Sequence, residues 1–87
     1  MERKKIYEII DGERDYQDSR WKNPEQDTHE PESWIIYIEH YLTKAKVALS
    51  TQPIPTAYLE AMDNMRKVVA LGVRCMEVHG VPRRTVK

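Results

Sequence analysis

The chain has 87 residues and one cysteine, and its 14 lysines and arginines balance its 14 aspartates and glutamates. This length allows a single domain, whose core is marginal without a cross-link or a second copy. Because one cysteine excludes an internal disulfide, we expect oligomerisation to complete the core. A balanced charge gives no general reason to expect nucleic-acid binding.

The sequence also predicts a cytoplasmic location. The N-terminal residues lack the apolar run of a secretory signal, and no apolar stretch is long enough to cross a bilayer. Charge is nevertheless segregated along the chain. Residues 1–33 carry 10 acids against 6 bases, a net charge of −4, whereas residues 34–87 carry 4 acids against 8 bases, a net charge of +4.

A first helix is predicted over residues 3–19. Ile6, Ile9 and Ile10 recur at helical spacing, and Gly12 marks a point where this helix could break. The next segment, residues 22–30, has no apolar side chain apart from its proline. We expect a polar loop there, longer than a plain connection needs, and loops of this kind often carry function.

Two long helices are predicted next, over residues 31–50 and 56–79. Pro31 suits a first helical position, and Gly80 suits the position just after a helix. The second of these helices carries its apolar residues in one stripe, which we expect to face the core. The stripe consists of Tyr58, Ala61, Met62, Met65, Val68, Val69, Gly72, Cys75 and Met76.

Only about six residues join these two helices, so they should be antiparallel neighbours. Residues 83–87 form a short basic tail. The predicted fold class is therefore all-α: one domain, residues 1–87, with a short N-terminal helix and a long antiparallel helical hairpin. We expect the hairpin to complete a helix bundle in a homo-oligomer, at least a dimer.

The segment 13–21, Glu-Arg-Asp-Tyr-Gln-Asp-Ser-Arg-Trp, resembles an "ER-x-x-Q-D-x-x-W" opening found in small phage and prophage proteins described as MazG-like. Residues 65–77 resemble the second core helix of those proteins. The resemblance implies an all-α oligomer, located in the host bacterial cytoplasm if the protein is phage-encoded. Active members of the family are nucleoside triphosphate pyrophosphohydrolases that hold Mg²⁺ with carboxylates.

The sequence departs from that family pattern at the expected metal ligands. Where the resemblance places acidic residues on the first core helix, this chain has His40, Tyr41 and Lys44. On the facing helix it has Asn64 and Lys67. Lysines in such a site repel Mg²⁺, so we expect no metal, no cofactor and no catalytic residue, and the balance of the argument is against an enzyme.

The charge inversion suggests a site that binds a nucleotide without cleaving it, because lysine contacts phosphate directly. A phage-type protein could use such a site to sequester a host immune messenger, which makes counter-defence the expected role. The candidate phosphate-binding residues are Lys44, Lys67, Arg66, Arg14 and Gln17. The candidate stacking residues are Trp34, Tyr37 and Trp21.

Each of these residues also has a structural interpretation. The aromatic residues could fill a core or an interface, and the bases, Arg74 among them, could be solvated. Arg14 and Gln17 could tie down the polar loop instead of lining a nucleotide groove. Two other functions stay open: a Mg²⁺-dependent pyrophosphohydrolase that uses Glu39, Glu60 and Asp63, and a scaffold that binds a protein.

Overall fold

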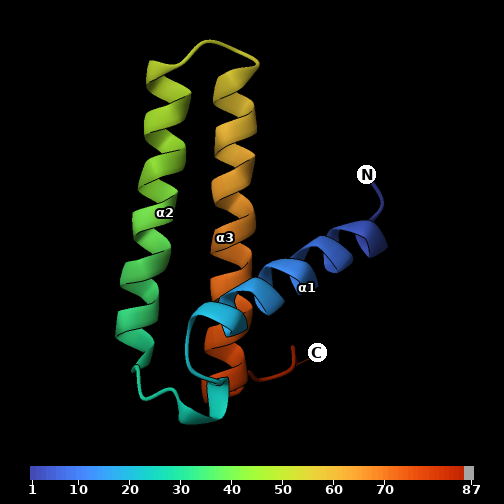
Figure 1. Cartoon of the computed structure of the whole chain (residues 1–87), viewed down its shortest axis with the longest axis vertical. Helices are drawn as coiled ribbons and strands as arrows, with labels where there is room; N and C mark the ends of the chain where they lie inside the picture. The colour runs from blue at the N-terminus through green and yellow to red at the C-terminus, as the bar shows by residue number, and fades with distance from the viewer. Residues whose placement is uncertain (86–87) are drawn as a thin grey trace.

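The computed structural model describes residues 1–85, which form three α-helices and one short 3₁₀ turn (Figure 1). The elements are α1 (Arg3–Arg20), η1 (Pro24–Gln26), α2 (Pro31–Thr51) and α3 (Thr56–His79). The described chain has no strand, so the all-α prediction is confirmed. The predicted basic tail lies partly outside the described residues, since its last two positions are 86 and 87.

Helices α2 and α3 form an antiparallel hairpin whose arms lie side by side (Figure 1). The half of the hairpin next to its connecting turn is packed with alanines: Ala45 and Ala48 near the end of α2 are buried, as are Ala57 and Ala61 near the start of α3. Small side chains let two helix axes approach closely. The larger buried groups gather at the open end of the hairpin, where Trp34 is only 2% exposed.

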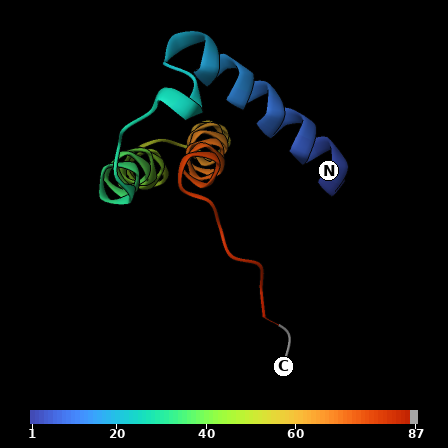
Figure 2. The same ribbon diagram turned by 90° about the horizontal axis from the view of Figure 1, so that it is seen from below.

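Helix α1 crosses α3 near its own C-terminal end and then diverges (Figures 1 and 2). It is continuous through Gly12, so the break that the sequence suggested there is wrong. A Cβ at Gly12 would meet nothing within 4 Å, so the neighbouring structure places no demand on this position. Ile6 and Ile9 stay exposed, because none of the helices described in this structure packs against the N-terminal half of α1.

Polar contacts dominate the interface between α1 and α3. The buried Arg14 donates from Nε to Glu77 (2.6 Å) and from Nη1 to Gln17 (3.1 Å). Its neighbour Glu13 accepts a hydrogen bond from Arg66 Nε (2.8 Å), three turns earlier on α3 than Glu77. Together with the pair between Arg74 and Asp18 (2.7 Å), these arginine–carboxylate pairs fix how α1 crosses α3.

The buried face of α3 differs from the predicted apolar stripe. The residues that face the core are Ala57, Ala61, Asn64, Ala70, Leu71 and Arg74. Most of the predicted stripe is exposed instead, including Tyr58, Met62, Met65, Val69 and Met76. The prediction of a single core-facing stripe was wrong, because α3 has two faces and the more apolar one is uncovered. None of the helices described in residues 1–85 is both long enough and apolar enough to cross a membrane.

A candidate ligand pocket

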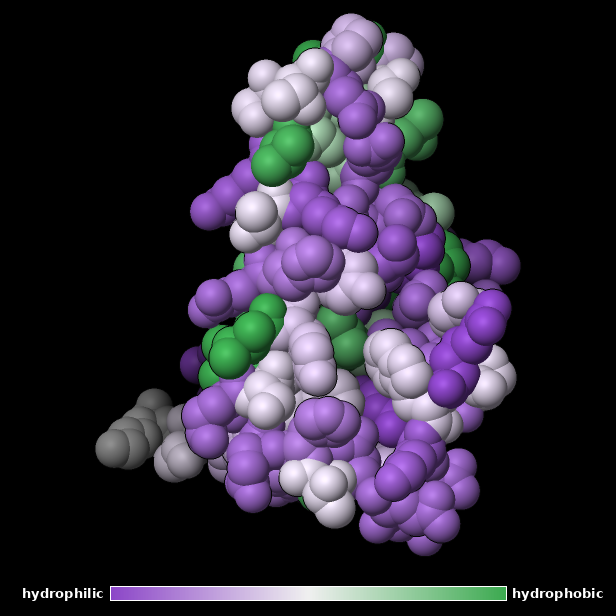
Figure 3. All heavy atoms as spheres, turned by 60° about the vertical axis from the view of Figure 1, so that its left-hand side comes forward, coloured by the Kyte–Doolittle hydropathy of each residue, from purple (hydrophilic) through white to green (hydrophobic). Residues whose placement is uncertain are grey.

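A cavity of about 580 Å³ lies between the loop that follows α1 and the open end of the hairpin. Figure 3, seen from the α2 side, shows a mostly hydrophilic surface with a hydrophobic patch set back among hydrophilic neighbours. Leu71 and five ring-bearing residues contribute to the cavity lining. The rings belong to Trp21, His29, Trp34, Tyr37 and Tyr41.

The spacing of the aromatic residues on α2 explains how the cavity wall forms. Trp34, Tyr37 and Tyr41 are three and four residues apart, so they share one side of the helix. His29 packs edge-to-face on Trp34 (ring centroids 5.7 Å apart) and on Tyr37 (5.8 Å). Such edge-to-face arrangements are favourable for aromatic rings, so they help to fix the wall.

Arg74 of α3 anchors the opposite wall and is completely buried. Its Nη1 donates to Asp18 Oδ1 (2.7 Å), at the end of α1. Its Nη2 donates to the backbone carbonyl of Lys22 and to Asp27 Oδ2 (3.1 Å), both in the loop. One side chain therefore joins α3 to the end of α1 and to the loop.

The guanidinium of Arg74 also lies near two tryptophans. Its Cζ is 5.4 Å from the centroid of the Trp21 ring and 5.7 Å from that of Trp34. The sequence interpretation of Arg74 as a solvated base is therefore wrong. The available signal was its position three residues after Leu71, on the same buried face as Ala57 and Asn64.

The loop has further anchors in Asp27 and two histidines. Asp27 Oδ1 accepts from the backbone N–H of His29 (2.9 Å) and from His29 Nδ1 (2.7 Å). His79 Nε2, at the end of α3, donates to the His29 carbonyl (2.7 Å). Burial raises the pKa of Asp27, but the hydrogen bonds from His29 and Arg74 outweigh burial, so the pKa lies below its ordinary value.

The two predicted phosphate-binding lysines lie beside the cavity. Lys44 Nζ is 5.4 Å from the centroid of the Tyr41 ring, and Lys67 Nζ is 5.6 Å from the same centroid. Both lysines line a second, shallower depression of about 480 Å³ between α2 and α3. Tyr41 lines the larger cavity, so its ring lies between that cavity and the two lysines that line the smaller depression.

These lysines differ in their partners. Lys67 pairs with Asp63 (3.2 Å), whereas Lys44 makes no ion pair with any residue of the described chain. Asp63 also pairs with Arg66 (2.7 Å). Burial raises the pKa of Asp63, but hydrogen bonds from Arg66 and Lys67 outweigh this effect and lower it. Lys44 is thus the more available cation.

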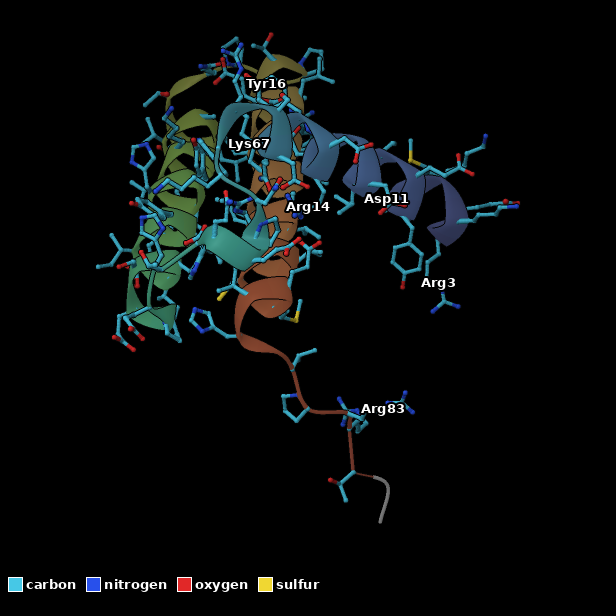
Figure 4. The ribbon with its side chains drawn as sticks, turned by 60° about the horizontal axis from the view of Figure 1, so that its bottom comes forward. Arg3, Asp11, Arg14, Tyr16, Lys67 and Arg83 are labelled. Carbon is cyan, nitrogen blue, oxygen red and sulfur yellow. The ribbon has the colours of Figure 1, made fainter. Side chains whose placement is uncertain are left out.

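The other three predicted phosphate-binding residues, Arg66, Arg14 and Gln17, line neither of the two hollows. Arg66 bridges Glu13 and Asp63; burial lowers its pKa, but these two carboxylates outweigh burial and raise it. Arg14 and Gln17 are buried where α1 meets α3, as Figure 4 shows for Arg14. Neither of them lines a cavity wall. Arg74, which the sequence interpretation left out, anchors the loop instead.

The predicted stacking residues are brought together. Trp34 and Tyr37 come from α2, and Trp21 follows the end of α1, yet all three line the cavity. The cavity lining also includes three cationic side chains. These are Arg20, Lys22 and Arg74, and one of them, Arg74, is already paired with Asp18 and Asp27.

Two of the three carboxylates considered for metal-dependent hydrolysis have protein partners, and the third, Glu39, is exposed on α2. Glu60 accepts a hydrogen bond from Gln52 (2.8 Å), and Asp63 pairs with Arg66 and Lys67. Across residues 1–85, no group of three or more histidine, cysteine, aspartate or glutamate side chains is placed to hold a metal ion.

Comparison of the chain with protein-family models, curated proteins and solved structures gives no significant match.

Proposed function

We propose that this protein binds a nucleotide or a nucleotide-derived molecule in the aromatic cavity and does not hydrolyse it. The observation that carries the proposal is the combination of aromatic walls with adjacent cations in one hollow of about 580 Å³. Aromatic side chains stack on nucleobases with about 1–3 kcal/mol per base. A cavity of this volume falls within the range of small-molecule sites.

The cations beside the cavity provide for the phosphates. Lys44 and Lys67 lie over Tyr41, and Arg20 and Lys22 lie in the cavity lining. A base held by Tyr37 and Tyr41 would leave its phosphates within reach of these side chains. Lysine binds phosphate as a point charge without requiring a metal ion.

We further propose that the chain is a MazG-like protein of phage type that sequesters a nucleotide signal of host immunity. The support is the similarity of residues 13–21 to the family's opening motif. In this chain the motif residues hold the pocket together: Asp18 pairs with Arg74, and Trp21 lines the cavity. Oligomerisation belongs to the same proposal.

Intrinsic fluorescence gives a direct test, because the chain has two tryptophans and both line the cavity. AMP, GMP, UMP and cyclic di-AMP are titrated into the purified protein, with inorganic phosphate as a separate titrant. We expect at least one nucleotide to quench tryptophan emission and to release heat in calorimetry. Tyr37→Ala and the double variant Lys44→Glu/Lys67→Glu should each weaken binding at least tenfold.

Tyr7→Ala and Lys4→Glu serve as matched controls. Both residues lie on the exposed N-terminal half of α1, away from the cavity, so their variants should bind like the wild type. The proposal fails if no nucleotide binds. It also fails if Tyr37→Ala and Tyr7→Ala bind equally well.

The hydrolase alternative keeps one supporting observation: Glu60 and Asp63 line the same depression as Lys44 and Lys67. Incubation with nucleoside triphosphates and Mg²⁺, with detection of pyrophosphate, separates the two functions. Binding without pyrophosphate release supports capture. Turnover that Glu60→Gln abolishes supports the pyrophosphohydrolase.

A further inference from the structure

The helical hairpin is covered on one side only. Figure 2 shows α1, η1 and the connecting loop on one side of the α2–α3 pair, while no helix of residues 1–85 lies on the other side. On α2, Ile35, Leu42 and Leu49 recur every seven residues and are exposed. At about 100° per residue, they point away from the side that carries Tyr37 and the cavity.

Helix α3 carries a matching repeat on the same uncovered side. The apolar residues of this repeat follow one another at alternating steps of four and three residues, which is the spacing by which a helix packs against a partner helix. They begin two residues into the helix and continue almost to its end. The members are Tyr58, Met62, Met65, Val69, Gly72 and Met76, of which all but the half-buried Gly72 are exposed.

The chain also exposes more surface than a compact monomer of its mass. Its accessible surface is 7044 Å², whereas a folded monomer of 10.3 kDa is expected to expose roughly 5,400 Å². The radius of gyration, 14.6 Å, likewise exceeds the roughly 12 Å expected for 87 residues. The excess surface is larger than the roughly 800 Å² that each partner buries in a standard interface.

We propose that a second copy of this chain docks on this uncovered α2–α3 face, through a two-fold axis that passes near Leu42. The occupant is argued from the repeat itself, because a second hairpin brings the same seven-residue period to the contact. A two-fold interface uses the same patch on both copies, so it needs no other partner. Pairing α2 antiparallel to its copy sets Leu42 against Leu42 and Ile35 against Leu49.

The charges at the edge of the face agree with this arrangement. Glu39 lies three residues before Leu42 and Lys46 lies four residues after it, and both are exposed. In the antiparallel pairing, Glu39 of each copy lies opposite Lys46 of the other. The zero net charge of the chain also leaves no overall repulsion between copies.

Neighbouring isoleucines provide a matched test by sedimentation velocity. Ile35 is 56% exposed and lies on the face, whereas Ile36 is 63% exposed and points about 100° away. We expect the wild type to sediment as a dimer or a higher oligomer and Ile35→Glu to sediment as a monomer. Ile36→Glu should behave as the wild type. A monomeric wild type, or equal effects of the two variants, would overturn the proposal.

A charge exchange tests the antiparallel arrangement. Glu39→Lys and Lys46→Glu should each weaken dimerisation roughly five- to tenfold, since each breaks two symmetry-related exposed pairs and creates two repulsions. The double variant should restore the wild-type constant. Failure of the double variant to restore it rules out this pairing. The face lies opposite the cavity, so these outcomes are independent of the nucleotide titrations.

Discussion

At the scale of single residues, Arg74 has the largest structural role in the site. It is fully buried, pairs with Asp18 and Asp27, and lies beside both tryptophans. A buried charge is tolerated when carboxylates and carbonyls surround it, and it becomes costly when a partner is removed. The shape of the cavity therefore depends on carboxylates supplied by segments far from α3 in the sequence.

Asp27→Asn tests this dependence through pH. Because the folded-state pKa of Asp27 is lowered, its carboxylate stabilises the fold above about pH 3.8, and this contribution is lost as pH falls through the lower folded-state value. We expect the variant to lose about 1–3 kcal/mol of unfolding free energy at pH 7. The difference from the wild type should shrink at pH 2–3, as measured by urea unfolding at each pH.

Asp11→Asn is the matched control, because Asp11 lies on the projecting half of α1 (Figure 4). It should unfold like the wild type at both pH values. If Asp27→Asn is as stable as the wild type at pH 7, the proposed anchoring of the loop by Asp27 and Arg74 is wrong.

At the scale of elements, local chemistry sets the residues at which each helix begins and ends, whereas packing against neighbouring helices sets where the helix lies. Pro31 begins α2, and the 53–55 segment with two prolines separates α2 from α3. Gly80 follows α3 with φ of +79°, a conformation that suits glycine. Gly12 differs from Gly80, because it lies inside α1 and nothing around it requires the absence of a side chain.

Gly12→Ala should therefore stabilise the protein by about 0.5–1 kcal/mol, since alanine favours the helix and glycine does not. Gly80→Ala should instead destabilise it by about 1 kcal/mol, because a side chain is strained at positive φ. Thermal unfolding followed by circular dichroism measures both. A loss of stability in Gly12→Ala would contradict the observed course of α1.

At the scale of the whole molecule, the two sides of the hairpin have different characters. One side carries the cavity, the polar loop and the buried ion pairs. The other side is an apolar face that no segment of the described chain covers. This uncovered face accounts for part of the large apolar surface exposed by a chain whose mean hydropathy is −0.73.

If the second copy docks as proposed, stability depends on protein concentration. A tenfold increase in protomer concentration should raise the midpoint of thermal unfolding by about 4 °C, because unfolding is then coupled to dissociation. Ile35→Glu should remove this dependence, whereas Ile36→Glu should keep it. Differential scanning calorimetry at 10 µM and 100 µM makes the comparison, and an unchanged wild-type midpoint would contradict a coupled dimer.

The sequence by itself determined the all-α class, because helical spacing of apolar residues, prolines and Gly80 are local signals that act within a few residues. It also pointed to Trp21, Trp34 and Tyr37, whose large rings stand out in a short polar chain. Only the tertiary structure decided that these rings share a cavity and that Arg74 anchors its wall. Those contacts join residues about 50 positions apart, and no local pattern records which carboxylate a buried arginine will meet. The same reason explains the two faces of α3: periodicity shows that a stripe is apolar, but only the positions of α1 and α2 decide which stripe is covered.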